Sequence, residues 1–157
     1  MSTSPCETVA PPTWVVHCDG SALPNPGRMG LGVVIRAPDG ERHMLSQAVQ
    51  GVGCNNEAEL RAVMTGLHSL PHSCRHVVIY SDNSILVSQL MQLDARPVAR
   101  LANLFNEART LLNRFDTVAL KWIPRHRNAE ADALARGALG LAPKLARKTV
   151  STRQPGS

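Results

Sequence analysis

The chain has 157 residues, a hydrophobic content of 43% and a formal net charge of +5, from 17 Lys and Arg against 12 Asp and Glu. This composition excludes a wholly disordered chain, and the length suits one domain with its own core. The apolar runs are far too short to span a bilayer, and the first residues lack the pattern of a signal peptide. The four cysteines form neither a zinc-type pair nor a dense disulfide pattern. We therefore expect a cytoplasmic protein with reduced thiols and no contact with a membrane.

Residues 1–12 are rich in Ser, Thr and Pro and predict a disordered leader. Three strands follow before the middle of the chain, because apolar and β-branched residues run together or alternate with polar ones. The first strand is expected to end at Asp19, where Gly20 and Ser21 indicate a turn that opens a loop to residue 30. The expected strands are 13–18, 31–36 and 42–50.

Apolar residues at helical spacing predict four helices in the rest of the chain, with two more apolar strands between them. The helices are expected at 56–69, 83–92, 98–113 and 129–139, and the strands at 77–80 and 117–123. Asn55 or Asn56 would cap the first helix, and Trp14 and Trp122 are expected in the core. The order β-β-β-α-β-α-α-β-α predicts an α/β domain over residues 13–140, with a five-stranded mixed sheet flanked by helices. Residues 141–157 are expected to form a flexible basic tail.

Four carboxylates occupy comparable places in this plan. Asp19 and Asp82 follow two strands whose ends meet if the strands are parallel neighbours, Glu59 falls in the first helical turn, and Asp132 lies on the inner face of the last helix. Each has an ordinary alternative: a turn residue for the first two, a surface acid at a helix start for Glu59, and an ion pair with Arg136 for Asp132. Only their conjunction favours a function.

Four acids without clustered Cys or His form a set of hard oxygen ligands, which selects Mg²⁺ or Mn²⁺ over zinc. Two such ions about 4 Å apart activate a water and stabilise the leaving oxygen of a phosphodiester. If these four acids share one site, eight others remain to balance the 17 basic residues. The remaining surface would then attract polyanions such as nucleic acids.

The chain also resembles ribonuclease H of type 1, in a short form without the basic protrusion of some members. Ordered motifs spread over nearly the whole domain carry this resemblance. They are Asp19-Gly20-Ser21 with Asn25-Pro26-Gly27, Asn55-Asn56-Glu57-Ala58-Glu59-Leu60, Tyr80-Ser81-Asp82-Asn83, and Asn128-Ala129-Glu130-Ala131-Asp132-Ala133-Leu134-Ala135.

The resemblance implies a ribonuclease H-like fold and endonucleolytic hydrolysis of the RNA strand of RNA–DNA hybrids, which leaves 5′-phosphate and 3′-hydroxyl ends. It places the catalytic, metal-binding carboxylates on Asp19, Glu59, Asp82 and Asp132, with two Mg²⁺ or Mn²⁺ ions per site when substrate is present. His126 would be a further catalytic residue that shuttles protons or helps product leave. The alternative for His126 is one more cation in the basic segment 125–127.

The resemblance also implies residues that contact the hybrid. Asn25, Asn55 and Asn56 would reach its minor groove, where amides suit the 2′-hydroxyls of RNA, and turn or capping duty is their alternative. Two departures from the family pattern occur: Cys54 replaces a phosphate-binding threonine, and Ser84 stands where glutamine is common. The substrate-binding set is expected to be Gly20, Ser21, Asn25, Cys54, Asn55, Asn56 and Ser84.

Basic residues outside this set are expected to be solvated, with phosphate contacts as the alternative. They are Arg96, Arg100, Lys144, Arg147 and Lys148. Two rival functions remain: a non-catalytic module that binds hybrid or RNA, and a DNA nuclease of the same fold. The four clustered acids argue against a module that only binds. Asn25, Asn55 and Asn56 argue against a DNA nuclease. We expect a monomer with no obligate protein partner.

Overall fold

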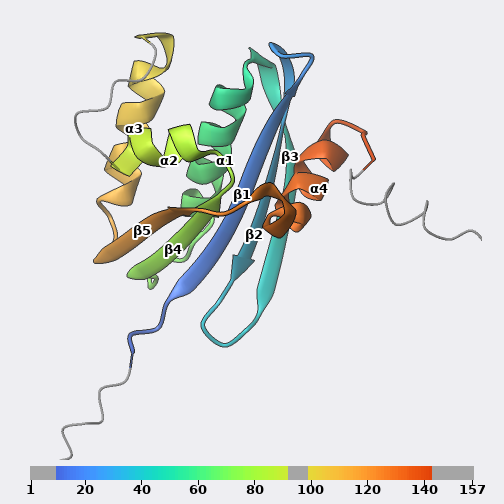
Figure 1. Cartoon of the computed structure of the whole chain (residues 1–157). Coiled ribbons are helices and arrows are strands. Elements are labelled where there is room, and N and C mark those ends of the chain that lie inside the picture. Colours follow the sequence, from blue (N-terminus) through green and yellow to red (C-terminus); the bar gives the residue numbers. More distant parts are fainter. Residues whose placement is uncertain (1–9, 92–98, 143–157) are drawn as a thin grey trace, which may run out of the picture.

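The computed structural model describes residues 10–91 and 99–142. Its five strands form one sheet in the order β3-β2-β1-β4-β5 (Figure 1). The antiparallel pairs are β1 with β2 and β2 with β3, whereas β4 runs parallel to both β1 and β5. The predicted mixed sheet of the α/β class is therefore confirmed. The strands are β1 (Trp14–Leu23), β2 (Gly27–Arg36), β3 (Arg42–Gly53), β4 (His76–Ser81) and β5 (Thr117–Trp122).

Helices cover both faces of the sheet (Figure 1). A Cβ on Gly20 would lie 2.2 Å from the Ala58 backbone of α1, and a Cβ on Gly32 would lie 2.1 Å from the Ala131 carbonyl of α4. Gly20 pairs with Leu31, the neighbour of Gly32, so the two glycines face opposite sides and each admits one helix. The helices are α1 (Asn55–His68), α2 (Ser84–Met91), α3 (Ala102–Leu112) and α4 (Ala129–Ala138), with 3₁₀ turns at Ala99–Leu101 and Arg125–Arg127.

The main core lies between the sheet and the helices α1 and α3. Apolar side chains from each element are removed from water there, at about 1.5–3 kcal/mol for each large side chain. The apolar residues of α1 that recur at helical spacing lie in this core. The core includes Val16, Val33, Leu60, Val63, Leu67, Ile79 and Phe105.

Several predicted boundaries are wrong. β1 continues through Gly20 and Ser21 to Leu23, so the expected loop to residue 30 is only a short turn. Gly20 was interpreted as a turn residue, but it instead allows α1 to approach the strand closely. Trp122 is 52% exposed rather than buried, because β5 is an edge strand. The expected leader and tail lie largely outside the described residues, as do Arg96, Lys144, Arg147 and Lys148.

Candidate active site

A pocket of about 420 Å³ lies at the carboxyl end of β4, where its parallel pairing with β1 stops. The parallel pairing of these strands ends at His17 opposite Tyr80. Asp19 and Asp82 each follow two residues later, and they therefore reach the same edge. The lining residues are Asp19, Gly20, Ser21, Asn55, Glu59, Asp82, Asn83, Ser84, Ile85, Arg125 and Asp132.

Three of the four predicted acids form a tight group in this pocket. One carboxylate oxygen from each of Asp19, Glu59 and Asp82 lies within 4.8 Å of the others. Asp132 lines the same pocket from α4 but stands outside that tight group. The structure thus brings together side chains from β1, α1, the end of β4 and α4.

The pocket strongly disfavours negative charge on its innermost acids. Asp19 is only 6% exposed, and burial, followed by the charges of Asp82 and Asp132, raises its pKa to about 8. Burial and the charges of Asp19 and Asp82 likewise raise the pKa of Glu59 well above its usual value. Across residues 10–91 and 99–142, no Lys, Arg or His forms an ion pair with any of the four acids. A cation from outside the chain would relieve this repulsion.

The donor set fits a hard divalent cation. Three converging carboxylates supply only oxygen ligands, the kind that Mg²⁺ and Mn²⁺ prefer over softer metals. The Cys18 thiol is buried beside them, and burial together with the charges of Glu59, Asp19 and Asp82 raises its pKa well above its usual value. That thiol therefore stays protonated, and it is a poor metal ligand.

Two of the ordinary alternatives are wrong. Asp132 does not pair with Arg136, because the Arg136 Nε donates to the Ala142 carbonyl at 2.8 Å. Glu59 lies beyond the first turn of α1; Glu57 occupies that turn and pairs with Arg61 at 2.8 Å.

The expected substrate residues separate into two groups. Gly20, Ser21, Asn55 and Ser84 line the pocket, whereas Asn25, Cys54 and Asn56 lie outside its wall. The outer asparagines bond to their neighbours: Asn25 Oδ1 accepts from the Asn55 amide at 3.0 Å, and Asn56 Oδ1 accepts from Asn83 Nδ2 at 3.3 Å. Their roles toward a substrate stay predictions.

Cys54, rather than Asn55 or Asn56, caps α1. Its Sγ accepts from the Glu57 amide at 3.4 Å and also from Arg100 Nη2 at 3.1 Å. The Asn55 side chain instead accepts from the Ala22 amide of β1 at 2.7 Å. This bond joins the start of α1 to the strand that carries Asp19.

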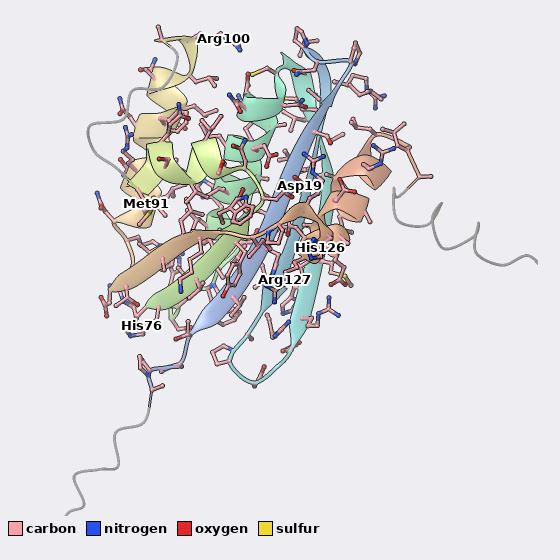
Figure 2. All side chains as sticks on the ribbon, viewed as in Figure 1. Asp19, His76, Met91, Arg100, His126 and Arg127 are labelled. Carbon is pink, nitrogen blue, oxygen red and sulfur yellow. The ribbon has the colours of Figure 1, made fainter. Side chains whose placement is uncertain are left out.

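The segment after β5 differs most from expectation. His126, which Figure 2 labels, is exposed and does not line the pocket, whereas its neighbour Arg125 does. Sequence reasoning did not single out Arg125, Asn83 or Ile85, although all three are neighbours in sequence of residues that it did name. Asn128 occupies the N-cap position of α4, where asparagine commonly caps a helix, but its side chain makes no capping bond. Its Nδ2 instead donates to the Asp82 carboxylate.

The sheet order and the buried acidic pocket define a ribonuclease H-like α/β protein with a candidate centre for divalent cations. Residues 17–138 match the family model described as reverse transcriptase-like. The chain is 33% identical to a ribonuclease H of Idiomarina loihiensis, over 83% of this chain and 90% of that protein. It belongs to the ribonuclease H type 1 family of enzymes.

Further comparisons agree with this membership. The solved structure of LC11-RNase H1 in complex with an RNA/DNA hybrid matches with a TM-score of 0.73 and 27% identity, over 81% of this chain and 96% of that one. A bifunctional protein of Mycobacterium tuberculosis is 30% identical over 91% of this chain. The chain spans only 42% of the length of that relative.

Proposed function

We propose that this chain is a metal-dependent endoribonuclease that hydrolyses the RNA strand of RNA–DNA hybrids and leaves 5′-phosphate and 3′-hydroxyl ends. The observation that carries the proposal is the convergence of Asp19, Glu59 and Asp82 within 4.8 Å in a pocket that Asp132 also lines. The related LC11-RNase H1, with its RNA/DNA hybrid, supports the choice of substrate.

Asp19, Glu59, Asp82 and Asp132 would hold the cations, two Mg²⁺ or Mn²⁺ ions per site when substrate is bound. When bound, such ions supply an activated water and stabilise the leaving oxygen of a phosphodiester. The protein holds the acids in place before substrate arrives: Asp19 is fixed in a paired strand and Glu59 in the second turn of α1. Little reorganisation is then needed during reaction.

The substrate would lie along the pocket rim formed by β1, α1 and the start of α2. The asparagine amides of residues 25, 55 and 56 suit the 2′-hydroxyls of the RNA strand, and Gly20, Ser21, Cys54 and Ser84 would lie close to the backbone. Arg125 lines the acidic pocket without an ion pair to the described acids. Its guanidinium is therefore free to bind a phosphate, and exposed His126 would assist beside it.

One assay tests the proposal. Labelled RNA–DNA hybrid, duplex RNA and duplex DNA are incubated with the chain in Mg²⁺, Mn²⁺ or EDTA, beside the Asp19→Asn variant. We expect cleavage of the hybrid RNA strand alone, only with metal, and only by the parent. Binding without cleavage would indicate a non-catalytic module, and equal cleavage of all duplexes would remove hybrid specificity.

Two expectations about the protein in the cell stay with this proposal: a monomer and a cytoplasmic location. Within residues 10–91 and 99–142, no helix is both long and apolar enough to cross a membrane. Light scattering of the purified chain, alone and with hybrid, measures the predicted monomer directly.

A further inference from the structure

Asn128 is one of the most deeply buried polar side chains in the described part of the chain, at 1% exposure. It lies at the start of α4, where an asparagine oxygen usually accepts a bond from the first helical turn. Here the side chain makes no such bond. Its Nδ2 instead donates to the Cys18 carbonyl oxygen at 2.9 Å and to Asp82 Oδ2 at 2.9 Å.

The two partners fix the orientation of this amide. Both are oxygens that can only accept, so only the NH₂ group of Asn128 can face them. A flipped amide would set its own oxygen against the Cys18 carbonyl and the Asp82 carboxylate, two repulsive contacts. The Oδ1 of Asn128 has no hydrogen-bond partner among the described residues. The site therefore uses this residue as a donor.

A neutral donor suits an acid that must stay available to a cation. The Asn128 bond holds one oxygen of Asp82 and leaves the carboxylate uncompensated, whereas an arginine or lysine there would neutralise it. Loss of a group that orients a metal ligand in this way typically weakens metal binding by about 10–100-fold.

Asn128 also connects three of the four segments that carry the acids. Its side chain bonds directly to Asp82 and to the carbonyl of the residue before Asp19. Its backbone carbonyl accepts from the Asp132 amide at 3.1 Å. One buried residue thus sets the spacing of β1, the end of β4 and α4 at the pocket.

We infer that Asn128 is a positioning residue of the acidic centre, which orients the Asp82 carboxylate and fixes the start of α4 so that the acids meet a divalent cation together. This inference rests on the proposed function for its meaning in catalysis. The positioning itself is measurable as cation affinity in the absence of any substrate.

The test is calorimetric titration of Mn²⁺ into the metal-free chain and into Asn128→Ala and Asn128→Asp. Asn128→Ala removes both donors, and Asn128→Asp keeps the shape while it places another carboxylate against Asp82. We expect Mn²⁺ to bind Asn128→Ala about 10–100-fold more weakly. The matched control is Leu112→Ala, a buried truncation in α3, which should lose thermal stability yet keep the parent's Mn²⁺ affinity.

Hybrid cleavage supplies a second readout, in which kcat should fall for Asn128→Ala while KM stays near the parent value. Parental Mn²⁺ affinity in Asn128→Ala and Asn128→Asp, or an equal loss in Leu112→Ala, would overturn the inference. If Asn128→Ala does not fold, Asn128→Ser, which keeps one donor, should show a smaller loss in the same direction. A parent that cleaves no hybrid would refute the proposed function, and the Mn²⁺ affinities would still decide the role of Asn128.

Discussion

Acidic side chains near the two ends of the parallel strands β4 and β5 lie in opposite electrostatic environments (Figure 2, in which His76 marks the start of β4). At the amino end, Arg75 Nη2 lies 2.7 Å from Asp116 Oδ1, and this contact lowers the pKa of the Asp116 carboxyl. At the carboxyl end, burial and neighbouring acids raise the pKa of Asp19 to about 8. Asp116 is therefore paired with Arg75 of the same chain. Asp19 lies among other acids, where a cation from solution would relieve the repulsion.

The largest effect that separates the two ends is on catalysis. We expect Asp19→Asn to lower hybrid cleavage about a thousandfold, because loss of the metal ligand forfeits several kcal/mol of transition-state stabilisation. Asp116→Asn removes an acid from the opposite end and should change the rate less than about twofold, as exposed ion pairs contribute little. Initial rates on labelled hybrid measure both. Comparable losses in the two variants would contradict the distinction.

The pH dependence of stability sharpens the same comparison. The pKa of Asp19 is higher in the folded chain than its usual 3.8, so the folded state binds that proton more tightly. The free energy of unfolding should therefore fall as pH rises from about 4 to about 8 without metal. Relative to Asp19→Asn, the metal-free parent should lose up to about 6 kcal/mol over this range, because one pKa unit corresponds to about 1.4 kcal/mol, and its Tm should fall accordingly.

Thermal melts in EDTA and in Mg²⁺ measure this difference. Added Mg²⁺ should raise the Tm of the parent more at the alkaline end of that range than at the acidic end, because the carboxylates must be ionised to bind it. The Asp19→Asn variant should show both effects in weaker form, because burial still raises the pKa of Glu59. A parent whose metal-free Tm follows that of Asp19→Asn at every pH would disprove the assigned charge repulsion.

Substitutions of Arg125 and His126, which lie in the segment beside the pocket, should change cleavage less than Asp19→Asn does. Arg125→Ala should weaken hybrid cleavage about tenfold, mainly through KM, because a hydrogen bond to a charged phosphate contributes about 1.5–3 kcal/mol. His126→Ala changes the exposed neighbour that does not line the pocket. If His126 is catalytic, its loss lowers kcat with KM retained; an unchanged kcat would make it a bystander. Steady-state kinetics at fixed salt separate the two outcomes.

The smallest expected effect is at the helix cap. Cys54 Sγ accepts from the Glu57 amide at 3.4 Å, and sulfur is a weaker acceptor than a threonine or serine oxygen. Cys54→Ser should raise the free energy of unfolding by about 0.5–1 kcal/mol, or about 1–4 °C in Tm. Cys54→Ala, which has no acceptor, is the matched control and should melt below the parent. The reverse order would show that the sulfur is the better cap.

The sheet could be predicted because its strands are apolar and β-branched or alternate apolar with polar residues, and the helices because residues such as Leu60, Val63 and Leu67 recur at helical spacing. The end of β1 could not be predicted in this way. Gly20 is a turn signal in sequence, yet here it leaves room for the Ala58 backbone. Only the position of a helix far along the chain distinguishes these two uses.

The acids of the site could be located from sequence because each lies just after an apolar strand segment or close to a helix start, at one edge of the predicted sheet. Their partners could not, since contacts across the chain decide them. Asn128 has the sequence context of a helix cap, and only the approach of α4 to β1 and β4 turns its amide toward Asp82. The exposure of Trp122 likewise depends on the strand order, which local pattern does not give.

The most direct test of the acidic centre is anomalous diffraction from crystals of Asp132→Asn grown with RNA–DNA hybrid and Mn²⁺, since this change should slow cleavage while the tight group of Asp19, Glu59 and Asp82 remains. The account predicts an anomalous peak between the carboxylate oxygens of those three residues, beside a phosphate of the RNA strand. A pocket without manganese, with the hybrid bound elsewhere on the chain, would contradict it.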